Sequence, residues 1–197
     1  MAIDGKANIL FVCLGNICIT LLTFSPFPPA TNLSSSPGRS TMAEGVFRSL
    51  TKTPSPHPTV GEIDSCGTGA YHAGDGPDSR TMSTLEDHGI TDYEHCARKF
   101  ANPDDFHRFD YILAMDRENL SDLQRLRQAY ERKLKAQGKE SEIAALGKVM
   151  MFGDFGGKKG EVIIDPYYGG RDGFDTAYKQ AVRFSQGLLK HLEEERA

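Results

Sequence analysis

The sequence has no excess of basic residues, few cysteines and no uninterrupted hydrophobic segment long enough to span a membrane. Its 23 lysines and arginines are outnumbered by 27 aspartates and glutamates, which gives a formal net charge of −4. This balance disfavours nucleic-acid binding through bulk positive charge. The chain has only four cysteines among 197 residues, and 39% of its residues are hydrophobic. It is therefore long enough to bury a core without disulfides, and we expect residues 1–197 to form one domain.

Charge is also missing locally, because residues 7–38 contain no ionisable group other than two cysteines. Residues 7–24 are mostly apolar, so a signal peptide or membrane anchor is one interpretation. Gly15 and Asn16 interrupt the centre of that run, and Asp4 lies in its leader, which disfavours both roles. Residues 7–13 instead have the pattern of a buried parallel strand that ends at a Gly-Asn turn.

Strand and helix patterns alternate along the rest of the chain. Strands are expected at 7–13, 62–66, 111–115 and 149–152, and helices at 41–51, 79–88, 117–137 and 174–192. A capping box of Thr41 and Glu44, an N-cap at Asp116 and a left-handed glycine at Gly89 mark helix ends, and 153–160 is expected to be a loop. The alternation predicts an α/β fold, a single-domain doubly wound sheet of four parallel strands with helices on both faces.

Ligands of such sheets bind beyond the carboxyl ends of the strands, so the loop after the first strand is the first candidate site. It begins Cys13-Leu-Gly-Asn-Ile-Cys18. A cysteine at the end of a buried strand, among inward-pointing backbone amides, can have a lowered pKa and act as a nucleophile. A buried structural cysteine is the alternative. Asp165-Pro-Tyr-Tyr-Gly169, near the other end, is an ordinary turn signal when taken alone.

Taken together, three segments resemble motifs of the low-molecular-weight protein tyrosine phosphatases of the acid phosphatase type. They are CLGNIC at 13–18, RSTMAE at 39–44 and DPYYG at 165–169, and the similarity continues through 64–74, 85–90, 95–100 and 104–123. The resemblance implies a cytoplasmic, monomeric hydrolase of phosphotyrosine proteins and small aryl phosphates. It implies no cofactor, and neither a nucleic acid nor a membrane as partner.

The resemblance also assigns roles to individual residues. Cys13 matches the nucleophile that forms a phosphocysteine intermediate, and Asp165 matches the acid that protonates the leaving group and then activates water. Arg39 matches the arginine that binds two phosphoryl oxygens, and Ser40 the hydroxyl that supports the thiolate. Ser65 and His95, together with Asn16, match positions that hold the loop in shape, although a histidine in isolation is more often an ordinary surface residue.

The remaining matched positions bind substrate. The phosphate-binding loop itself comprises Leu14, Gly15, Asn16, Ile17 and Cys18, and the aromatic walls of the cleft are Tyr71, Tyr167 and Tyr168, which could alternatively be plain core or surface residues. In relatives, the cysteine that matches Cys18 can form a reversible disulfide with the nucleophile. The resemblance also implies that Tyr167 or Tyr168 matches a phosphorylation site. No metal site is expected, because Cys66, His72, His88 and Cys96 lack a standard zinc-ligand spacing.

The sequence departs from the family pattern at one place. The family has arginine six positions after the cysteine, but position 19 is Ile19, and the matching arginine is Arg39. Removing residues 19–38 restores CLGNIC-RSTMAE, so we interpret these 20 residues as an irregular insert. We hypothesise that it is a retained in-frame intron or a gene-prediction error, which sequencing the transcript across the junction tests.

The insert leaves more than one function open. Extruding a 20-residue loop costs only a few kcal/mol, but misplacing catalytic groups by about 1 Å can cost on the order of a hundredfold in rate. We therefore expect a folded family member with strongly reduced or no phosphatase activity. A catalytically silent phosphate-binding or interaction protein is the second hypothesis. A thiol-dependent arsenate reductase is the third, disfavoured because Asp165 offers an acid for a phenolic leaving group.

Overall fold

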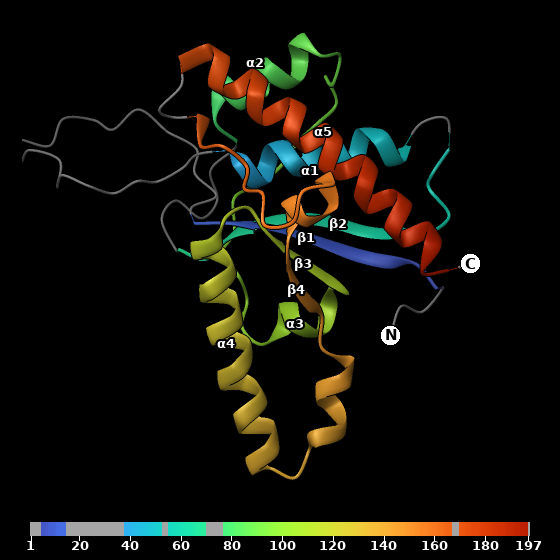
Figure 1. The fold of residues 1–197 in the computed structure, drawn as a ribbon, viewed down its shortest axis with the longest axis vertical. Coiled ribbons are helices and arrows are strands. Elements are labelled where there is room, and N and C mark those ends of the chain that lie inside the picture. The colour runs from blue at the N-terminus through green and yellow to red at the C-terminus, as the bar shows by residue number, and fades with distance from the viewer. Residues whose placement is uncertain (1–4, 15–37, 53–54, 70–76, 167–169, 197) are drawn as a thin grey trace, which may run out of the picture.

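The fold is built on a sheet of four parallel strands, as predicted. The computed structural model describes residues 5–14, 38–52, 55–69, 77–166 and 170–196. The strands are β1 (Ala7–Cys13), β2 (Val60–Gly67), β3 (Tyr111–Ala114) and β4 (Lys148–Met151), and they lie in the order β2-β1-β3-β4 (Figure 1). All three neighbouring pairs are parallel. The four expected strands are thus confirmed: β1 has the expected ends, and the ends of the other three differ by at most two residues.

Strand β1 is covered on both faces, which explains why its sequence carries no charge. Ile9 to Cys13 are completely buried. Ile9, Phe11 and Cys13 belong to the hydrophobic cluster on one face of the sheet, and Leu10 and Val12 to the cluster on the other. A charged side chain at any of these positions would have no route to solvent, so only apolar side chains are compatible with this central strand.

Helices cover both faces of the sheet, as the doubly wound prediction requires. On one side lie α1 (Arg39–Lys52), α2 (Ser79–Asp87) and α5 (Gly170–Glu194), and on the other α3 (Asp104–Arg108) and α4 (Arg117–Ala136) (Figure 1). Helix α1 packs between the sheet and α5, where Phe11 meets Phe47 edge to face at 5.6 Å between ring centroids. Burial of each such ring stabilises the fold by about 1.5–3 kcal/mol.

Two predicted helix-end signals are confirmed. The Asp116 side chain caps α4 by accepting a hydrogen bond from the Asn119 amide at 2.8 Å. Gly89 follows α2 with φ of +80°, a left-handed conformation that glycine adopts without a Cβ clash. These short-range signals therefore place the ends of both helices correctly.

Two other sequence expectations were wrong. Helix α1 begins at Arg39, two residues before the expected start, and Glu44 is completely buried instead of completing a capping box. The Thr41 hydroxyl donates to the Gly38 carbonyl at 3.0 Å. The expected loop at 153–160 begins inside a 3-10 helix, Phe152–Gly156, and neither α3 nor a second 3-10 helix, Glu140–Ala145, was expected. Such short elements have too few residues to show a periodic pattern.

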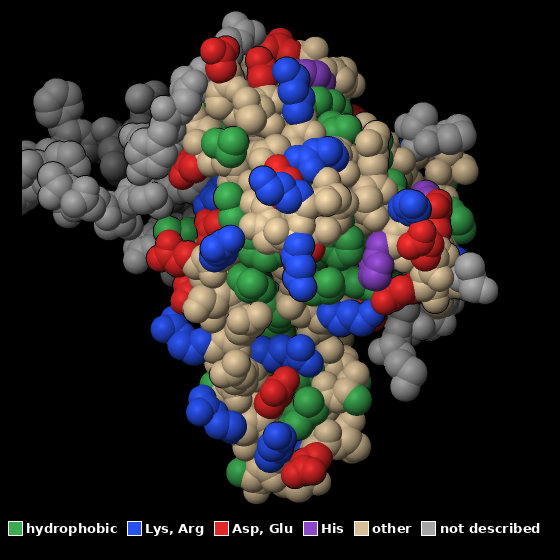
Figure 2. All heavy atoms as spheres, viewed as in Figure 1, with side chains coloured by type: hydrophobic (Ala, Val, Ile, Leu, Met, Phe, Trp, Pro, Cys, Tyr) green, Lys and Arg blue, Asp and Glu red, His purple; other side chains and the backbone are tan. Residues whose placement is uncertain are grey.

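The strand order shows at which end of the sheet a ligand crevice is expected. The chain passes from β1 to β2 on one side and returns to β3 on the other, so the order reverses at β1. In an open α/β sheet such a reversal leaves a crevice at the carboxyl end of the central strand. Cys13 is the last residue of β1 and therefore lies at that crevice. Within the described part of the chain, no helix is both long and apolar enough to cross a bilayer. Figure 2 shows basic and acidic side chains spread over the visible face of the molecule.

Candidate active site

The first element of the site is the contact between the end of β1 and the start of α1. The Sγ atom of Cys13 lies 3.0 Å from the Oγ atom of Ser40, and both side chains are completely buried. The backbone around Cys13 is fixed by the two residues that follow β2, because the Thr68 amide donates to the Cys13 carbonyl at 3.0 Å and the Gly69 amide donates to the Leu14 carbonyl at 2.8 Å. The α1 N-terminus, which favours negative charge, therefore begins beside the thiol.

Two opposing effects set the protonation of Cys13. Burial raises the pKa of the thiol, while the Ser40 hydrogen bond and the Arg39 charge lower it. Burial is the larger effect, so the pKa is raised overall. The lowered pKa expected from the sequence is thus not found for these described groups, because a fully buried thiolate loses its hydration. The backbone amides of residues 15–18, which that expectation invoked, lie outside the described residues.

Arg39 is the first residue of α1, next to Ser40, and its side chain is held at two points. Its Nη2 atom lies 2.6 Å from Asp116 Oδ2, and its Nη1 donates to the Ile163 carbonyl at 3.3 Å. The side chain is only 6% exposed, and its Nε atom has no hydrogen-bond partner within the described part of the chain. A buried guanidinium with an unused donor is suited to binding an anion at this point.

Asn119 joins α4 to the loop that follows Cys13. Its side chain is completely buried. With the amide oriented so that its nitrogen lies 3.2 Å from both carboxylate oxygens of Asp116, its oxygen accepts from the Leu14 amide at 3.1 Å. The α4 N-terminus therefore supports both Arg39 and Leu14. Sequence reasoning identified Asp116 only as a helix cap and did not single out Asn119 at all.

Asp165 lies in a segment that is tied to the same crevice. Two residues before it, the Ile163 carbonyl accepts from Arg39, and the Ile163 amide donates to the Met115 carbonyl at 3.0 Å. The Ile164 amide donates to Gln180 Oε1 of α5 at 2.9 Å. The Asp165 side chain is half-buried. These bonds bring the predicted acid, 152 positions after Cys13 in the chain, to the same end of the sheet.

Ser65 and His95 meet through a buried carboxylate, that of Glu44. Glu44 Oε2 accepts from the Ser65 hydroxyl at 2.6 Å and from the Tyr93 hydroxyl at 2.8 Å, and it lies 3.0 Å from His95 Nδ1. The Ser65 Oγ to His95 Nε2 distance is 3.4 Å. The two predicted support residues are thus brought together, while Glu44, the residue that joins them, was assigned only a capping role from the sequence.

This cluster is also where the described residues come nearest to a metal site. One ligand atom from each of Glu44, Asp64 and His95 lies within 4.8 Å of the others. Those atoms already take part in hydrogen bonds and ion pairs, including Arg98 Nε to Asp64 Oδ2 at 2.8 Å. The donor set therefore fits a hydrogen-bonded network better than a cation site. Cys66 is buried in the cluster on the face of the sheet opposite to Cys13, and Cys96 is exposed.

The structure thus brings Cys13, Leu14, Arg39, Ser40 and Asp165 to one end of the sheet, with Ser65 on β2 and His95 in contact with Ser65. The remaining predicted positions lie outside the described residues, namely Gly15, Asn16, Ile17, Cys18, Tyr71, Tyr167 and Tyr168, as does the insert apart from Gly38.

Comparisons with known proteins by sequence profile, by individual sequence and by structure agree with one another. The sequence profile of the low molecular weight phosphotyrosine protein phosphatases matches residues 35–197. A phosphatase of this description from Schizosaccharomyces pombe is 40% identical over 94% of this chain and 96% of its own length, and one from Homo sapiens is 35% identical over 96% and 98%. A crystal structure of a protein tyrosine phosphatase from Entamoeba histolytica with Hepes in its active site is similar, with a TM-score of 0.66, 29% identity and coverage of 98% of this chain and all of that one.

Proposed function

The chain belongs to the low molecular weight phosphotyrosine protein phosphatase family, and we propose that Cys13, Arg39 and Asp165 carry out the reaction in it. It is a protein tyrosine phosphatase, a hydrolase of phosphate monoesters. The observation that carries the residue assignment is the 3.0 Å contact between Cys13 Sγ and Ser40 Oγ, next to the buried guanidinium of Arg39.

In the first half-reaction the Cys13 thiolate attacks the phosphorus atom of a phosphotyrosyl group. The new S–P bond forms as the bond from phosphorus to the phenolic oxygen breaks, and the Asp165 carboxyl group donates its proton to that oxygen. The products are the free phenol and a phosphocysteine. Arg39 is placed to bind two phosphoryl oxygens and to stabilise the charge that develops on the transferring group.

In the second half-reaction water hydrolyses the phosphocysteine. The Asp165 carboxylate, now without its proton, accepts one from the water as the oxygen attacks phosphorus, and the S–P bond breaks. The Cys13 sulfur leaves as a thiolate, and the hydrogen bond from Ser40 stabilises that negative charge. Asp165 ends protonated again, so the two half-reactions return every group to its starting state.

The proposal also covers the substrate-binding residues, the location and oligomeric state of the enzyme, and the residues that position the site. Residues 14–18 would supply the backbone amides around the phosphate, and Tyr71, Tyr167 and Tyr168 the aromatic walls that favour aryl phosphates. The enzyme would act in the cytoplasm as a monomer. Asp116 and Asn119 are positioning residues in this scheme, because they hold Arg39 and Leu14 and do not touch the reacting atoms.

A second candidate, a catalytically impaired phosphate-binding protein, is favoured by one observation. Arg39 is already paired with Asp116 and the Ile163 carbonyl, so an incoming phosphoryl group must share or exchange these contacts. The insert at 19–38 adds to this, because it interrupts the loop that would enclose the phosphate. Activity of the chain relative to a version without residues 19–38 separates the two candidates.

The assignment of Cys13 is tested with Cys13→Ser. Hydrolysis of an aryl phosphate should fall to background, and rapid acid quenching of the unsubstituted chain with ³²P-labelled substrate should label the peptide that contains Cys13. Cys96→Ser, a change at an exposed free cysteine, is the matched control and should keep full activity. Retained activity in Cys13→Ser would refute the assignment. Arsenate reduction assayed on the same samples should be absent.

A further inference from the structure

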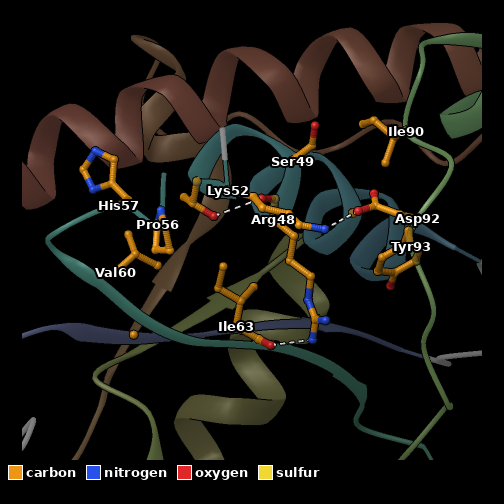
Figure 3. A pocket seen from close by; sticks show the side chains of 13 residues that line it. Arg48, Ser49, Lys52, Pro56, His57, Val60, Ile63, Ile90, Asp92 and Tyr93 are labelled. Atoms are coloured by element: carbon orange, nitrogen blue, oxygen red, sulfur yellow. Dashed lines mark hydrogen bonds and ion pairs between the residues drawn. The ribbon is translucent and has the colours of Figure 1, made fainter. Parts of the chain in front are cut away.

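A second hollow lies at the opposite end of β2 from the active site. It has a volume of about 460 Å³, and it is bounded by the second half of α1, the start of β2 and the segment from Ile90 to Tyr93 (Figure 3). Val60, at this end of β2, pairs with Ala7, whereas Gly67 pairs with Cys13. Ala7 and Cys13, the two ends of β1, are six positions apart in an extended strand, which corresponds to about 20 Å. The hollow is therefore separate from the catalytic crevice.

The walls of the hollow combine an apolar surface with exposed cations. Val60, Ile63, Ile90 and Pro56 supply aliphatic surface. Among the described lining residues, Arg48 and Lys52 are permanent cations, and Asp92 is the only carboxylate. His57 also lines the hollow but is paired with Glu193, 3.3 Å from its Nε2. The charge of the lining therefore favours an anionic ligand.

Arg48 and Lys52 are arranged so that one small group can reach both. They are four residues apart on α1, which puts their side chains on the same face, one helical turn apart. Figure 3 shows Arg48 extending across the hollow towards Ile63. Arg48 is 44% exposed and Lys52 69% exposed, so both retain donors that face solvent.

Both cations already bind carboxylates or carbonyl oxygens within the protein. Arg48 Nη2 lies 2.7 Å from Glu44 Oε1 and donates to the Ile63 carbonyl at 2.8 Å. Lys52 is paired with Asp92, whose side chain is 64% exposed. An ion pair with both partners this exposed contributes little to stability, so a ligand can replace it at low cost.

We propose that this hollow is a binding site for a small carboxylate with a hydrophobic body. The carboxylate would lie between Arg48 and Lys52, and the body would pack against Val60, Ile63 and Ile90. A volume of about 460 Å³ is within the range of small-molecule sites. An anionic head group is favoured because the two permanent cations of the described lining, Arg48 and Lys52, outnumber its one carboxylate, Asp92, and the planar guanidinium of Arg48 matches a carboxylate with two parallel hydrogen bonds.

A ligand bound in the hollow can affect the catalytic end of the sheet through Arg48 and Glu44. Arg48 is the ion-pair partner of Glu44 Oε1, an oxygen with no other hydrogen-bond partner within the described part of the chain. The other oxygen of the same carboxylate binds Ser65, Tyr93 and His95. A ligand carboxylate that binds the exposed donors of Arg48 shares this cation with Glu44, and it therefore changes the charge balance of the network that contains His95.

The site is tested by titrating the isotope-labelled full chain with 1-naphthoate and following NMR signals. The methyl signals of Val60, Ile63 and Ile90 should shift together with saturation, and the His95 ring signals should follow. Arg48→Gln should weaken binding by about tenfold or more, since a charged hydrogen bond is lost. Neutral 1-naphthalenemethanol should bind about tenfold more weakly for the same reason.

Two further variants keep the test decisive if Arg48→Gln fails to fold. Lys52→Gln should weaken binding, and Ser49→Phe should abolish it by filling the hollow that Ser49 lines. Arg125→Gln, a change at an exposed arginine on α4, is the control and should bind 1-naphthoate normally. The proposal is overturned if no signals shift, if the shifts map to Leu14 and Met115 instead, or if Ser49→Phe binds as tightly as the unsubstituted chain. Because the readout is binding, it does not depend on phosphatase activity.

Discussion

Cys13 and Ser40 lie 27 positions apart in the chain, yet Sγ of the one is 3.0 Å from Oγ of the other. The contact is made because β1 ends and α1 begins at the same edge of the sheet, and both elements are fixed by the core around Phe11 and Phe47. Closing a longer loop between two fixed ends costs little additional entropy. Packing of the core therefore places Ser40 and its neighbour Arg39 beside Cys13 in spite of the insert.

Ser40→Ala should make Cys13 less reactive. The Ser40 hydrogen bond lowers the pKa of the thiol, so its loss leaves burial less opposed and reduces the thiolate fraction at pH 7. We expect alkylation of Cys13 by iodoacetamide to slow by about tenfold, and its pH profile to move to higher pH. Ser49→Ala, also on α1, is the control. An unchanged alkylation profile in Ser40→Ala would show that the contact does not support the thiolate.

Asp165→Asn should remove the general acid. An amide cannot protonate the leaving oxygen, so the rate should fall by about 10²–10⁴-fold for phenyl phosphate, whose phenolate is a poor leaving group. The loss should be much smaller for p-nitrophenyl phosphate, because its leaving group needs less protonation. Asp172→Asn, on the exposed side of α5, should keep normal rates. Equal losses on both substrates would assign Asp165 another role.

Deletion of residues 19–38 should raise catalytic efficiency. It makes Arg39 follow Cys18 directly, so that consecutive amides can enclose one phosphate, and correcting a misplacement of about 1 Å is worth on the order of a hundredfold in rate. The measurement is kcat/KM for p-nitrophenyl phosphate with and without the insert. The deletion combined with Cys13→Ser should be inactive. A full-length chain as fast as its deleted version would mean that the insert leaves the phosphate loop intact.

Cys66 should reduce stability at alkaline pH. Burial raises the pKa of its thiol well above the ordinary value of 9.0, so the folded chain retains a proton that the unfolded chain loses. The contribution of this thiol to the free energy of unfolding is therefore fully present at pH values below its ordinary pKa of 9.0. It is lost as the pH rises above that value. At pH 10, one pH unit above the ordinary pKa, the loss from this group alone is on the order of 1 kcal/mol.

Urea unfolding at pH 8 and pH 10 measures that loss. In Cys66→Ala the decrease in unfolding free energy between the two pH values should be smaller by on the order of 1 kcal/mol. Comparing the two pH values within each variant cancels the packing cost of the smaller side chain. Cys96→Ala, at an exposed position, should show the same decrease as the unsubstituted chain. An equal decrease in Cys66→Ala would mean that its thiol ionises in the folded state.

Local patterns in the sequence determined the framework of this protein. The uncharged, apolar run of β1, the periodicity of α4 and α5, the cap at Asp116 and the glycine at Gly89 each depend on residues within a few positions of one another. Such signals are present before the chain folds, which is why they predict the elements and their order. The break in the loop motif at Ile19 is likewise visible in the sequence alone.

The tertiary structure alone decided the partners of the site residues. Arg39 binds the carbonyl of Ile163, 124 positions away, and Glu44 became the centre of a buried network only because β2 and the segment before α3 pack against α1. The protonation of Cys13 was decided in the same way. Burial raises the pKa of the thiol, and the hydrogen bond from Ser40 and the charge of Arg39 lower it by a smaller amount. The thiol becomes buried only when the sheet and helices pack around it, so its pKa cannot be predicted from the sequence.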